Sequence, residues 1–360
     1  MADNVKDREV LLKVEHLCQY FKLGRFAVNK AVDDVSFDIR QGEVFGLVGE
    51  SGCGKTTTGR SIIKLYDITS GNVYFKGQRI SAGTRSYKDA ISAARKEKRT
   101  CTDEARKAEL DRKIEENRAL IEDAKKCSKN VDRKLVNQIQ MIFQDPIASL
   151  DPRMTVRDII AEGLIIRGIK DKEYIDNKVY EMLETVGLVR EHASRYPHEF
   201  SGGQRQRIGV ARAVIMEPSL IIADEPISAL DVSIRAQIMN LLNDLRQKMG
   251  LTILFIAHDL SVVKYFSDRI GVMYFGHLVE LADSEELFRH PLHPYTRSLL
   301  SAIPQPDPEY EKNRKRIVYN PVADHDYRNS TPTFREVCEG HSVLCDDAEF
   351  EKYRKIIAGE

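Results

Sequence analysis

Short apolar runs separated by turn residues dominate residues 10–80 of the chain. Polar and apolar residues alternate over 32–39, which predicts a strand with one face exposed. Residues 44–48 carry no polar side chain, which predicts a strand buried on both faces. Apolar residues at helical spacing follow over 56–65. This part of the chain is therefore predicted to form strands, one of which leads through a glycine-rich loop into a helix.

The second half of the chain alternates between the same two patterns. Apolar runs over 138–143, 220–223 and 252–257 predict further strands, of which the last two belong to the core. Helical spacing occupies three further stretches: 153–195, 204–217 and 234–249. Strands and helices that alternate in this way predict an α/β fold.

Residues 82–135 have a different composition, because Gly and Pro are absent from Thr84 to Leu135 and charged residues dominate. Apolar or small side chains recur there at a 4-3 spacing in two sets, which fall out of register near 100–103. Thr and Asp in that break are suited to cap a second helix. A charged helical hairpin is predicted, with one long helix as the alternative. It carries 16 basic and 11 acidic residues, a net charge of +5.

The tail of the chain is rich in proline and charge. It contains Pro304, Pro306 and Pro308, followed by the basic run Lys312–Arg316. This composition is typical of a linker. We therefore predict a folded domain over 8–303 and a C-terminal extension over 304–360.

Composition excludes several classes of protein. Among the 360 residues, 55 Lys and Arg balance 55 Asp and Glu, so no excess of positive charge points to nucleic acid. Six scattered cysteines do not make a disulfide framework in a chain of this length. The N-terminus has no apolar signal core, and the apolar runs fall short of the roughly 20 residues that a membrane helix needs. The prediction is a soluble cytoplasmic protein that reaches a membrane only through a partner.

One motif has the fixed positions of a phosphate-binding loop, G-x-x-x-x-G-K-[ST]. It runs from Gly49 to Thr56 between the buried strand and the helix. Its backbone amides can surround phosphate oxygens, Lys55 adds a positive charge, and the Thr56 hydroxyl is suited to Mg²⁺. A chance cluster of glycines is the alternative, and the strand and helix on either side argue against it.

Asp224 and Glu225 follow the apolar run 220–223. Carboxylates at the end of a core strand are costly unless they serve a metal ion or a proton transfer. Asp224 is expected to hold Mg²⁺ through water, and Glu225 to polarise an attacking water. The alternative is that the two carboxylates are simply exposed in a turn. The phosphate loop argues against this alternative, because such a loop requires an acidic partner.

A second motif able to bind phosphate begins at Ser201, 23 residues before Asp224. Gly202 and Gly203 let the backbone approach an anion closely, and a helix that opens at Gln204 would point its positive end at the same place. One ATP cannot use both motifs of one chain. The prediction is that two chains sandwich ATP between them.

In their order along the chain, these motifs resemble those of the ATP-binding subunits of ABC transporters. The resemblance implies an ABC-type P-loop fold with a RecA-like core, an N-terminal antiparallel β part, a helical subdomain over about 150–215, and the charged hairpin as an insertion. It implies roles for Gln144 at Mg²⁺ and the attacking water, for His258 at the γ-phosphate, and for the loop Ser228–Asp231 across a dimer. It further implies these contacts to ATP within the chain: Gly49, Glu50, Ser51, Gly52, Cys53, Gly54, Lys55, Thr56 and Thr57.

The resemblance also assigns roles outside the phosphate loop. Phe21, or its neighbour Tyr20, is expected to stack on adenine, with a contribution of about 1–3 kcal/mol. The catalytic group is expected to comprise Lys55, Gln144, Glu225 and His258, and the metal-binding group Thr56, Gln144 and Asp224. Contacts to the partner's nucleotide are expected from Ser201, Gly202, Gly203, Gln204 and Asp231.

Two segments point to a particular group within this family. Residues 143–156 resemble the stretch that follows the glutamine loop in oligopeptide and dipeptide importers, and 293–304 resemble their C-terminal segment. Such importers pair two related ATPase chains, or two copies of one, at the cytoplasmic face of the membrane. These chains work beneath two membrane permeases that receive solute from an external binding protein. Nickel importers share much of the pattern and are the alternative.

The chain departs from the family at the insertion and in the tail. Lys55 and Gln144 lie 89 positions apart (144 − 55), about twice the family's usual separation, and the hairpin accounts for the excess. We expect the insertion to be solvated and inert. A second hypothesis is that it docks to a partner or to an anionic surface. Deletion of 84–130 would contradict this second hypothesis if transport and complex assembly were unchanged. Several relatives hold iron–sulfur through a cysteine cluster in the tail. Cys338 and Cys345 are too few for four thiolates and are expected to be ordinary thiols.

Other ATPases with these motifs fit the sequence less well. ATPases of DNA repair and chromosome structure carry much longer arms, placed after the glutamine loop, whereas this insertion precedes Gln144. Translation-type ATPases have two cassettes in one chain, and this chain has one. A catalytically inactive subunit is disfavoured because every consensus residue is intact.

Overall fold

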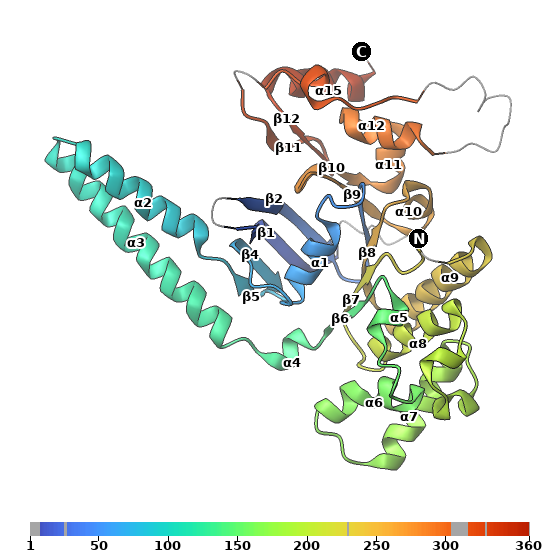
Figure 1. Cartoon of the computed structure of the whole chain (residues 1–360). Coiled ribbons are helices and arrows are strands. Elements are labelled where there is room, and N and C mark those ends of the chain that lie inside the picture. The colour runs from blue at the N-terminus through green and yellow to red at the C-terminus, as the bar shows by residue number, and fades with distance from the viewer. Residues whose placement is uncertain (1–7, 25–26, 229, 304–315, 328–329, 360) are drawn as a thin grey trace.

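The computed structural model describes residues 8–24, 27–228, 230–303, 316–327 and 330–359. Two sheets form the centre of the molecule, and helices surround them (Figure 1). This arrangement confirms the predicted α/β fold.

The first sheet is the antiparallel part that was expected near the N-terminus. Its strand order is β2-β1-β4-β5. The strands are β1 (Val10–Lys22), β2 (Val28–Arg40), β4 (Ser70–Phe75) and β5 (Gln78–Ala82). Apolar residues on one face of this sheet, among them Val14, Phe37 and Phe75, join a core with Leu47 and Ile256 of the second sheet. The alternating pattern thus has its expected cause, a sheet with one buried face.

The second sheet has eight strands in the order β11-β12-β10-β9-β3-β8-β7-β6. They are β3 (Val44–Val48), β6 (Ile139–Ile142), β7 (Leu220–Asp224), β8 (Thr252–Ala257), β9 (Arg269–Tyr274), β10 (His277–Asp283), β11 (Thr333–Cys338) and β12 (His341–Cys345). The five strands from β9 to β6 run parallel, so their carboxyl ends share one edge. All residues of β3, β7 and β8 are buried, as the unbroken apolar runs predicted.

Helices flank both sheets. Among the described residues, those outside the insertion and the subdomain are α1 (Lys55–Ile62), α9 (Val232–Met249), α10 (Leu260–Phe266), α11 (Ser284–Arg289), α12 (Pro294–Ser301), α14 (Pro321–Asp324) and α15 (Asp347–Ala358). None of the helices in the described ranges combines the length and the apolar character needed to cross a membrane.

The predicted helical subdomain is present between β6 and β7 (Figure 1). It comprises α5 (Pro146–Ser149), α6 (Val156–Ile166), α7 (Lys172–Thr185), two 3₁₀ turns (Arg190–Ser194 and Pro197–Glu199) and α8 (Gly202–Val214). The predicted start of α8 at Gln204 is wrong by two residues. The helix begins at Gly202 because the Ser201 hydroxyl accepts from the Gln204 amide, and the Gln204 side chain accepts from the Ser201 amide.

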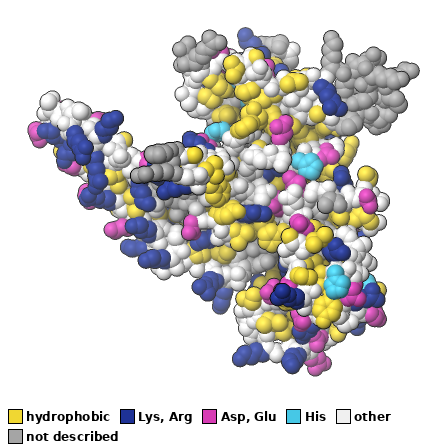
Figure 2. Space-filling model, in the orientation of Figure 1, with side chains coloured by type: hydrophobic (Ala, Val, Ile, Leu, Met, Phe, Trp, Pro, Cys, Tyr) yellow, Lys and Arg dark blue, Asp and Glu magenta, His cyan; other side chains and the backbone are white. Residues whose placement is uncertain are grey.

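The insertion is the predicted helical hairpin, and the alternative of one long helix is wrong. Helix α2 (Arg85–Thr100) and helix α3 (Glu104–Lys129) pack along a seam of Ile91, Ala94, Leu110 and Ile114. Asp103 caps α3, as expected from its place in the register break, by accepting from the Ala105 amide. The hairpin projects from the body of the molecule, and Lys and Arg side chains line it (Figure 2). The short helix α4 (Arg133–Val136) leads back to β6.

The expectation of a linker-like tail is wrong for residues 333–358. Strands β11 and β12 form a hairpin, and β12 extends the large sheet by pairing with β10, across the boundary predicted at residue 304. Helix α15 packs on this hairpin, where Leu292, Val343, Cys345 and Tyr353 form a small buried cluster. These apolar residues form a small core, although the charge and proline content of the tail indicated a linker. The prolines and most of the basic run lie outside the described residues.

Candidate nucleotide-binding and catalytic site

The predicted phosphate loop connects β3 to α1 at the carboxyl edge of the large sheet. Gly54 precedes the helix with φ of +108°, a conformation that favours glycine. A Cβ atom at Gly54 would lie 2.2 Å from the Ala31 carbonyl oxygen, so no other residue fits without moving the backbone. The motif's glycine is therefore explained by its surroundings as well as by its conformation.

Lys55 is buried and reaches back across the loop. Its Nζ donates to the carbonyl oxygens of Gly49 at 2.7 Å and Glu50 at 2.9 Å. These contacts hold the ammonium group against the loop's own backbone. The positive charge is thereby placed where the loop amides would receive phosphate oxygens.

Tyr295 anchors the loop, although no pattern in the sequence indicated this role. The Glu50 amide donates to the Tyr295 hydroxyl at 3.0 Å, although 245 positions separate the two residues. Tyr295 lies on α12, is buried, and packs its ring on that of Tyr274 with centroids 4.4 Å apart. Burial raises the pKa of Tyr295, so the hydroxyl stays neutral. The segment 293–304 was singled out for its resemblance, but nothing in it indicated a contact with the loop.

Asp224 and Thr56 form a pair suited to a metal ion. The Thr56 hydroxyl donates to Asp224 Oδ1 at 2.8 Å. Asp224 is fully buried, and its Oδ2 has no hydrogen-bond partner among the described residues. Burial raises the pKa of Asp224, although the Thr56 hydrogen bond and the charge of Arg60 oppose the rise. An orphaned carboxylate oxygen beside a hydroxyl fits Mg²⁺, which prefers oxygen ligands and would stabilise the charged carboxylate.

Glu225 lies between two other predicted catalytic residues. Gln144 Nε2 donates to Glu225 Oε2 at 3.1 Å, and His258 Nδ1 lies 3.1 Å from the same oxygen. The three residues follow β6, β7 and β8, whose carboxyl ends are adjacent. The side chain of Glu225 is 12% exposed and that of His258 is 51% exposed, so the carboxylate is the more enclosed group. The structure thus brings together a group that can position a water molecule.

The backbone at Glu225 is also held in place. Its φ is +44°, in the left-handed region that side-chain-bearing residues seldom adopt. The Glu225 amide donates to the Ile256 carbonyl oxygen at 2.9 Å, which continues the pairing of β7 with β8. Such strain in a non-glycine residue is typical of a functional position.

The two candidate adenine-stacking residues occupy different surroundings. Phe21 packs edge-on against Tyr66, with ring centroids 5.3 Å apart. The Tyr20 hydroxyl donates to Asp33, and Lys30 lies over the Tyr20 ring. Tyr20 is therefore engaged through both its hydroxyl and its ring, whereas Phe21 forms an aromatic pair that could extend to a base.

The motif predicted to act across a dimer lies at the surface. Ser201 and Gly202 are exposed, as is Asp231 at the start of α9. A Cβ at Gly203 would come within 2.7 Å of the Ile234 side chain, so glycine lets α8 lie close to α9. The two elements expected to reach a partner are thus next to each other on one chain. Ala229, in the same predicted loop, lies outside the described residues.

Comparison with protein families gives two matches. A model described as ABC transporter matches residues 32–134 and 112–228. A model described as oligopeptide/dipeptide transporter, C-terminal region, matches residues 279–343. The second match includes most of β10, all of β11 and the start of β12.

Relatives with curated names resemble the chain over almost its whole length. The oligopeptide transport ATP-binding protein OppF of Bacillus subtilis (strain 168) is 55% identical over 346 residues, which are 96% of this chain and 99% of the relative. The dipeptide transport ATP-binding protein DppF of Lactococcus lactis subsp. cremoris (strain MG1363) is 48% identical over 348 residues, 96% of this chain and 97% of the relative.

Solved structures resemble the fold. A dimeric bacterial ABC transporter cassette matches with a TM-score of 0.57 and 26% identity, over 76% of this chain and 99% of the other. A dimeric ATP-binding cassette in a post-hydrolysis state with ADP and Pi bound matches with a TM-score of 0.57 and 24% identity, over the same shares of the two chains.

Proposed function

The chain belongs to the ABC transporter family, and we propose that it is the ATP-hydrolysing subunit of an importer of oligopeptides or dipeptides. The observation that carries the ATPase activity is the set of contacts around Glu225, which Gln144 and His258 join beside the Thr56–Asp224 pair. The peptide substrate is supported by the names of the relatives and by the match over 279–343.

The phosphate loop would bind the triphosphate of ATP through its amides and Lys55. Lys55 now contacts the carbonyl oxygens of Gly49 and Glu50, and phosphate oxygens are better partners for its charge. Thr56 and Asp224 would hold Mg²⁺, with Gln144 as a further ligand through its amide oxygen. When bound, Mg²⁺ supplies positive charge that stabilises the phosphoryl group during transfer.

Glu225 would orient the attacking water and accept its proton. His258 and Gln144 both contact Glu225 Oε2, and so restrict the orientation of the carboxylate before a substrate arrives. A fixed carboxylate avoids the cost of reorganisation during the reaction. Phe21 would stack on adenine, with its ring already packed against Tyr66.

A second chain would complete each ATP site. The exposed Ser201–Gln204 motif would close on the γ-phosphate bound by a partner, and Asp231 would contact the same partner. Hydrolysis removes the phosphate that bridges the chains, so the dimer would open. Segment 144–160, which leads from the Glu225 contact into α6, would transmit this motion to two membrane permeases. The partner would be a paralogous ATPase or a second copy of this chain, at the cytoplasmic face, and an external binding protein would supply peptide to the permeases.

Uptake by the host organism tests this proposal. Cells that carry Lys55→Ala should lose ATP-dependent uptake of labelled short peptides, whereas Lys113→Ala, on the exposed part of α3, should retain it. Purification from host membranes should recover permeases and a peptide-binding protein together with the chain. If Lys55→Ala cells lost uptake of labelled nickel but took up peptides normally, the proposed peptide substrate would be wrong. Recovery of DNA-bound partners would contradict the proposed role in transport.

A further inference from the structure

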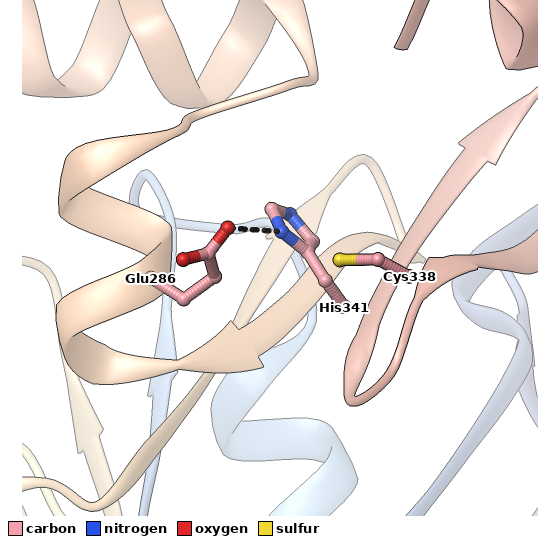
Figure 3. A group of neighbouring side chains, drawn as sticks. All are labelled: Glu286, Cys338 and His341. Carbon is pink, nitrogen blue, oxygen red and sulfur yellow. Dashed lines mark ion pairs between the residues drawn. The ribbon is translucent and has the colours of Figure 1, made fainter. Parts of the chain in front are cut away.

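Three side chains with metal-binding groups meet where the C-terminal hairpin faces the core. Cys338 ends β11, His341 begins β12, and Glu286 lies on α11. One ligand atom from each residue lies within 4.8 Å of those of the other two. Figure 3 shows the imidazole between the other two side chains, with the sulfur and the carboxylate directed toward it. Neither ATP binding nor hydrolysis uses these residues.

The state of His341 determines what this cluster can bind. The ring is fully buried, and its Nε2 lies 2.9 Å from Glu280 Oε1. A carboxylate only accepts hydrogen bonds, so Nε2 carries a proton. Glu280 also accepts from the backbone amides of Leu292 at 2.7 Å and His293 at 3.1 Å, which fixes its position. The ring orientation is therefore set from one side, and Nδ1 points toward the other.

His341 Nδ1 is a buried nitrogen without a hydrogen-bond partner among the described residues. It lies 3.6 Å from Glu286 Oε1, which is too long for a hydrogen bond. A neutral ring with its proton on Nε2 presents a lone pair to this oxygen. Two acceptors that face each other repel, and a cation bound between them would remove this repulsion.

The spacing fits a tetrahedral metal ion. Bonds of about 2.0–2.3 Å to nitrogen, oxygen and sulfur place neighbouring ligand atoms of a tetrahedral ion about 3.3–3.6 Å apart. The 3.6 Å between Nδ1 and Oε1 is close to this range, and movements of the Cys338 side chain within the 4.8 Å cluster would complete the set. His290 Nδ1 lies 3.0 Å from the same Glu286 oxygen and can hold that carboxylate in place.

We propose that Glu286, Cys338 and His341 bind one Zn²⁺ ion, with water as the fourth ligand. Thiolate, imidazole and carboxylate together favour Zn²⁺ over Mg²⁺ or Ca²⁺, which prefer oxygen ligands. Glu280 holds the imidazole as the partner of a metal-bound histidine commonly does.

The ion would link the turn of the β11–β12 hairpin to α11. Two register pairs, Glu280↔Val343 and Leu281↔Ser342, join β12 to β10, so this attachment is short. A metal bond that joins β11, β12 and α11 would add stability to the C-terminal part of the fold. Cys345 has a different role, because it is buried beside Leu292 and Tyr353 and burial raises the pKa of its thiol to about 11.

Metal titration of the whole chain tests the site. The protein, purified without a polyhistidine tag and stripped with a chelator, is titrated with Zn²⁺ against a chromophoric chelator in excess Mg²⁺. We expect one tightly bound Zn²⁺ per chain, and a thiolate charge-transfer band when Co²⁺ replaces it. Cys338→Ser should abolish the band, and Cys338→Ser and Glu286→Gln should each weaken Zn²⁺ binding at least about 10-fold.

A matched variant and a folding control accompany these measurements. Cys101→Ser changes a partly exposed cysteine in the charged hairpin and should bind Zn²⁺ as the parent does. Circular dichroism and ATP binding establish that each variant is folded. The proposal is overturned if the parent binds no stoichiometric Zn²⁺, if folded Cys338→Ser binds it equally well, or if Co²⁺ gives no thiolate band.

Discussion

The carboxyl edge of the large sheet, where the candidate ATP site lies, and the α2–α3 hairpin are both rich in charged residues. The surroundings of these charges differ between the two regions. At the edge, Lys55 and Asp224 are buried, and each has particular partners within the fold. In the hairpin, charges such as Lys98 and Asp111 pair at the surface, where their side chains are 37% and 55% exposed. Water can replace the partner of an exposed charge, whereas a buried charge that loses its partner pays the full cost of desolvation.

This difference separates residues that the fold requires from residues that it tolerates. The hairpin is held by a small apolar seam and by surface ion pairs, most of which are local. At the carboxyl edge of the large sheet, the side chains in contact come from segments distant in sequence, such as Gln144 and Glu225. Substitutions at the edge should therefore have large and specific effects, and substitutions of hairpin charges small ones.

The largest expected effect is at Glu225. Replacement by Gln keeps the size of the side chain but removes the base that would accept a proton from the attacking water. We expect ATP turnover to fall about 10²–10⁴-fold. ATP should still bind, so the variant should accumulate an ATP-bound dimer, detectable by size-exclusion chromatography with labelled nucleotide.

The matched control for this variant is Glu116→Gln, a change of the same chemistry on exposed α3. Its turnover should equal that of the parent chain. A Glu225→Gln variant with parental turnover would refute the catalytic role of this residue. A slow Glu116→Gln variant would remove the distinction between the two regions.

A buried carboxylate in the core should make stability depend on pH. Glu43 is fully buried next to Arg269, and burial raises its pKa from the ordinary value of 4.5 to about 7, although Arg269 opposes the rise. The folded state therefore holds a proton that the unfolded state releases. The free energy of unfolding should fall by up to about 3 kcal/mol as pH rises from about 4.5 to 7, and this contribution should be constant above that range.

Glu43→Gln removes this titration because an amide does not ionise. Urea unfolding at several pH values should show a flatter profile for the variant between about pH 4.5 and 7 than for the parent. Glu116→Gln, which changes an exposed carboxylate, should leave the profile unchanged. Parallel profiles for Glu43→Gln and the parent would show that Glu43 stays ionised over the whole range.

A smaller effect is expected at Tyr295, which anchors the phosphate loop. Tyr295→Phe keeps the ring that packs on Tyr274 and removes the acceptor of the Glu50 amide. An unsatisfied amide costs about 1–2 kcal/mol, so ATP should bind about 5–30-fold more weakly. Tyr87→Phe on α2 provides the same chemical change in the hairpin and should not alter the ATP affinity, measured by calorimetry. Unchanged affinity in Tyr295→Phe would mean that the loop keeps its shape without this hydrogen bond.

Local sequence patterns predicted most of the fold and the central part of the candidate site. The phosphate loop and Asp224–Glu225 have fixed spacings next to strands, and the Asp103 cap lies at a visible break in the heptad pattern. The structure places Gln144, Glu225 and His258 in contact, although their catalytic roles stay predictions.

Contacts between distant segments were beyond this kind of inference. The hydrogen bond from Glu50 to Tyr295 spans 245 positions and leaves no periodic signal in either segment. The β11–β12 hairpin was missed because proline and charge before it suggested a linker, while its few apolar residues gain a core only after β12 pairs with β10. The cluster of Glu286, Cys338 and His341 depends on that same pairing.

The smallest expected effect tests the exposed charges directly. Lys98 Nζ contacts both carboxylate oxygens of Asp111 at 2.5 Å, the kind of geometry in which an exposed pair contributes most. Asp111→Asn should nevertheless destabilise the hairpin by less than about 1 kcal/mol, because solvent and salt screen both groups. Hydrogen exchange of α2 and α3 amides should show this difference at low salt and lose it near 1 M salt, where the Debye length is only about 3 Å. Leu110→Ala, in the buried seam, should speed exchange far more and at every salt concentration, because it removes apolar packing. If Asp111→Asn matched Leu110→Ala, ion pairs would hold the hairpin together, and its charges would be as necessary as those around ATP.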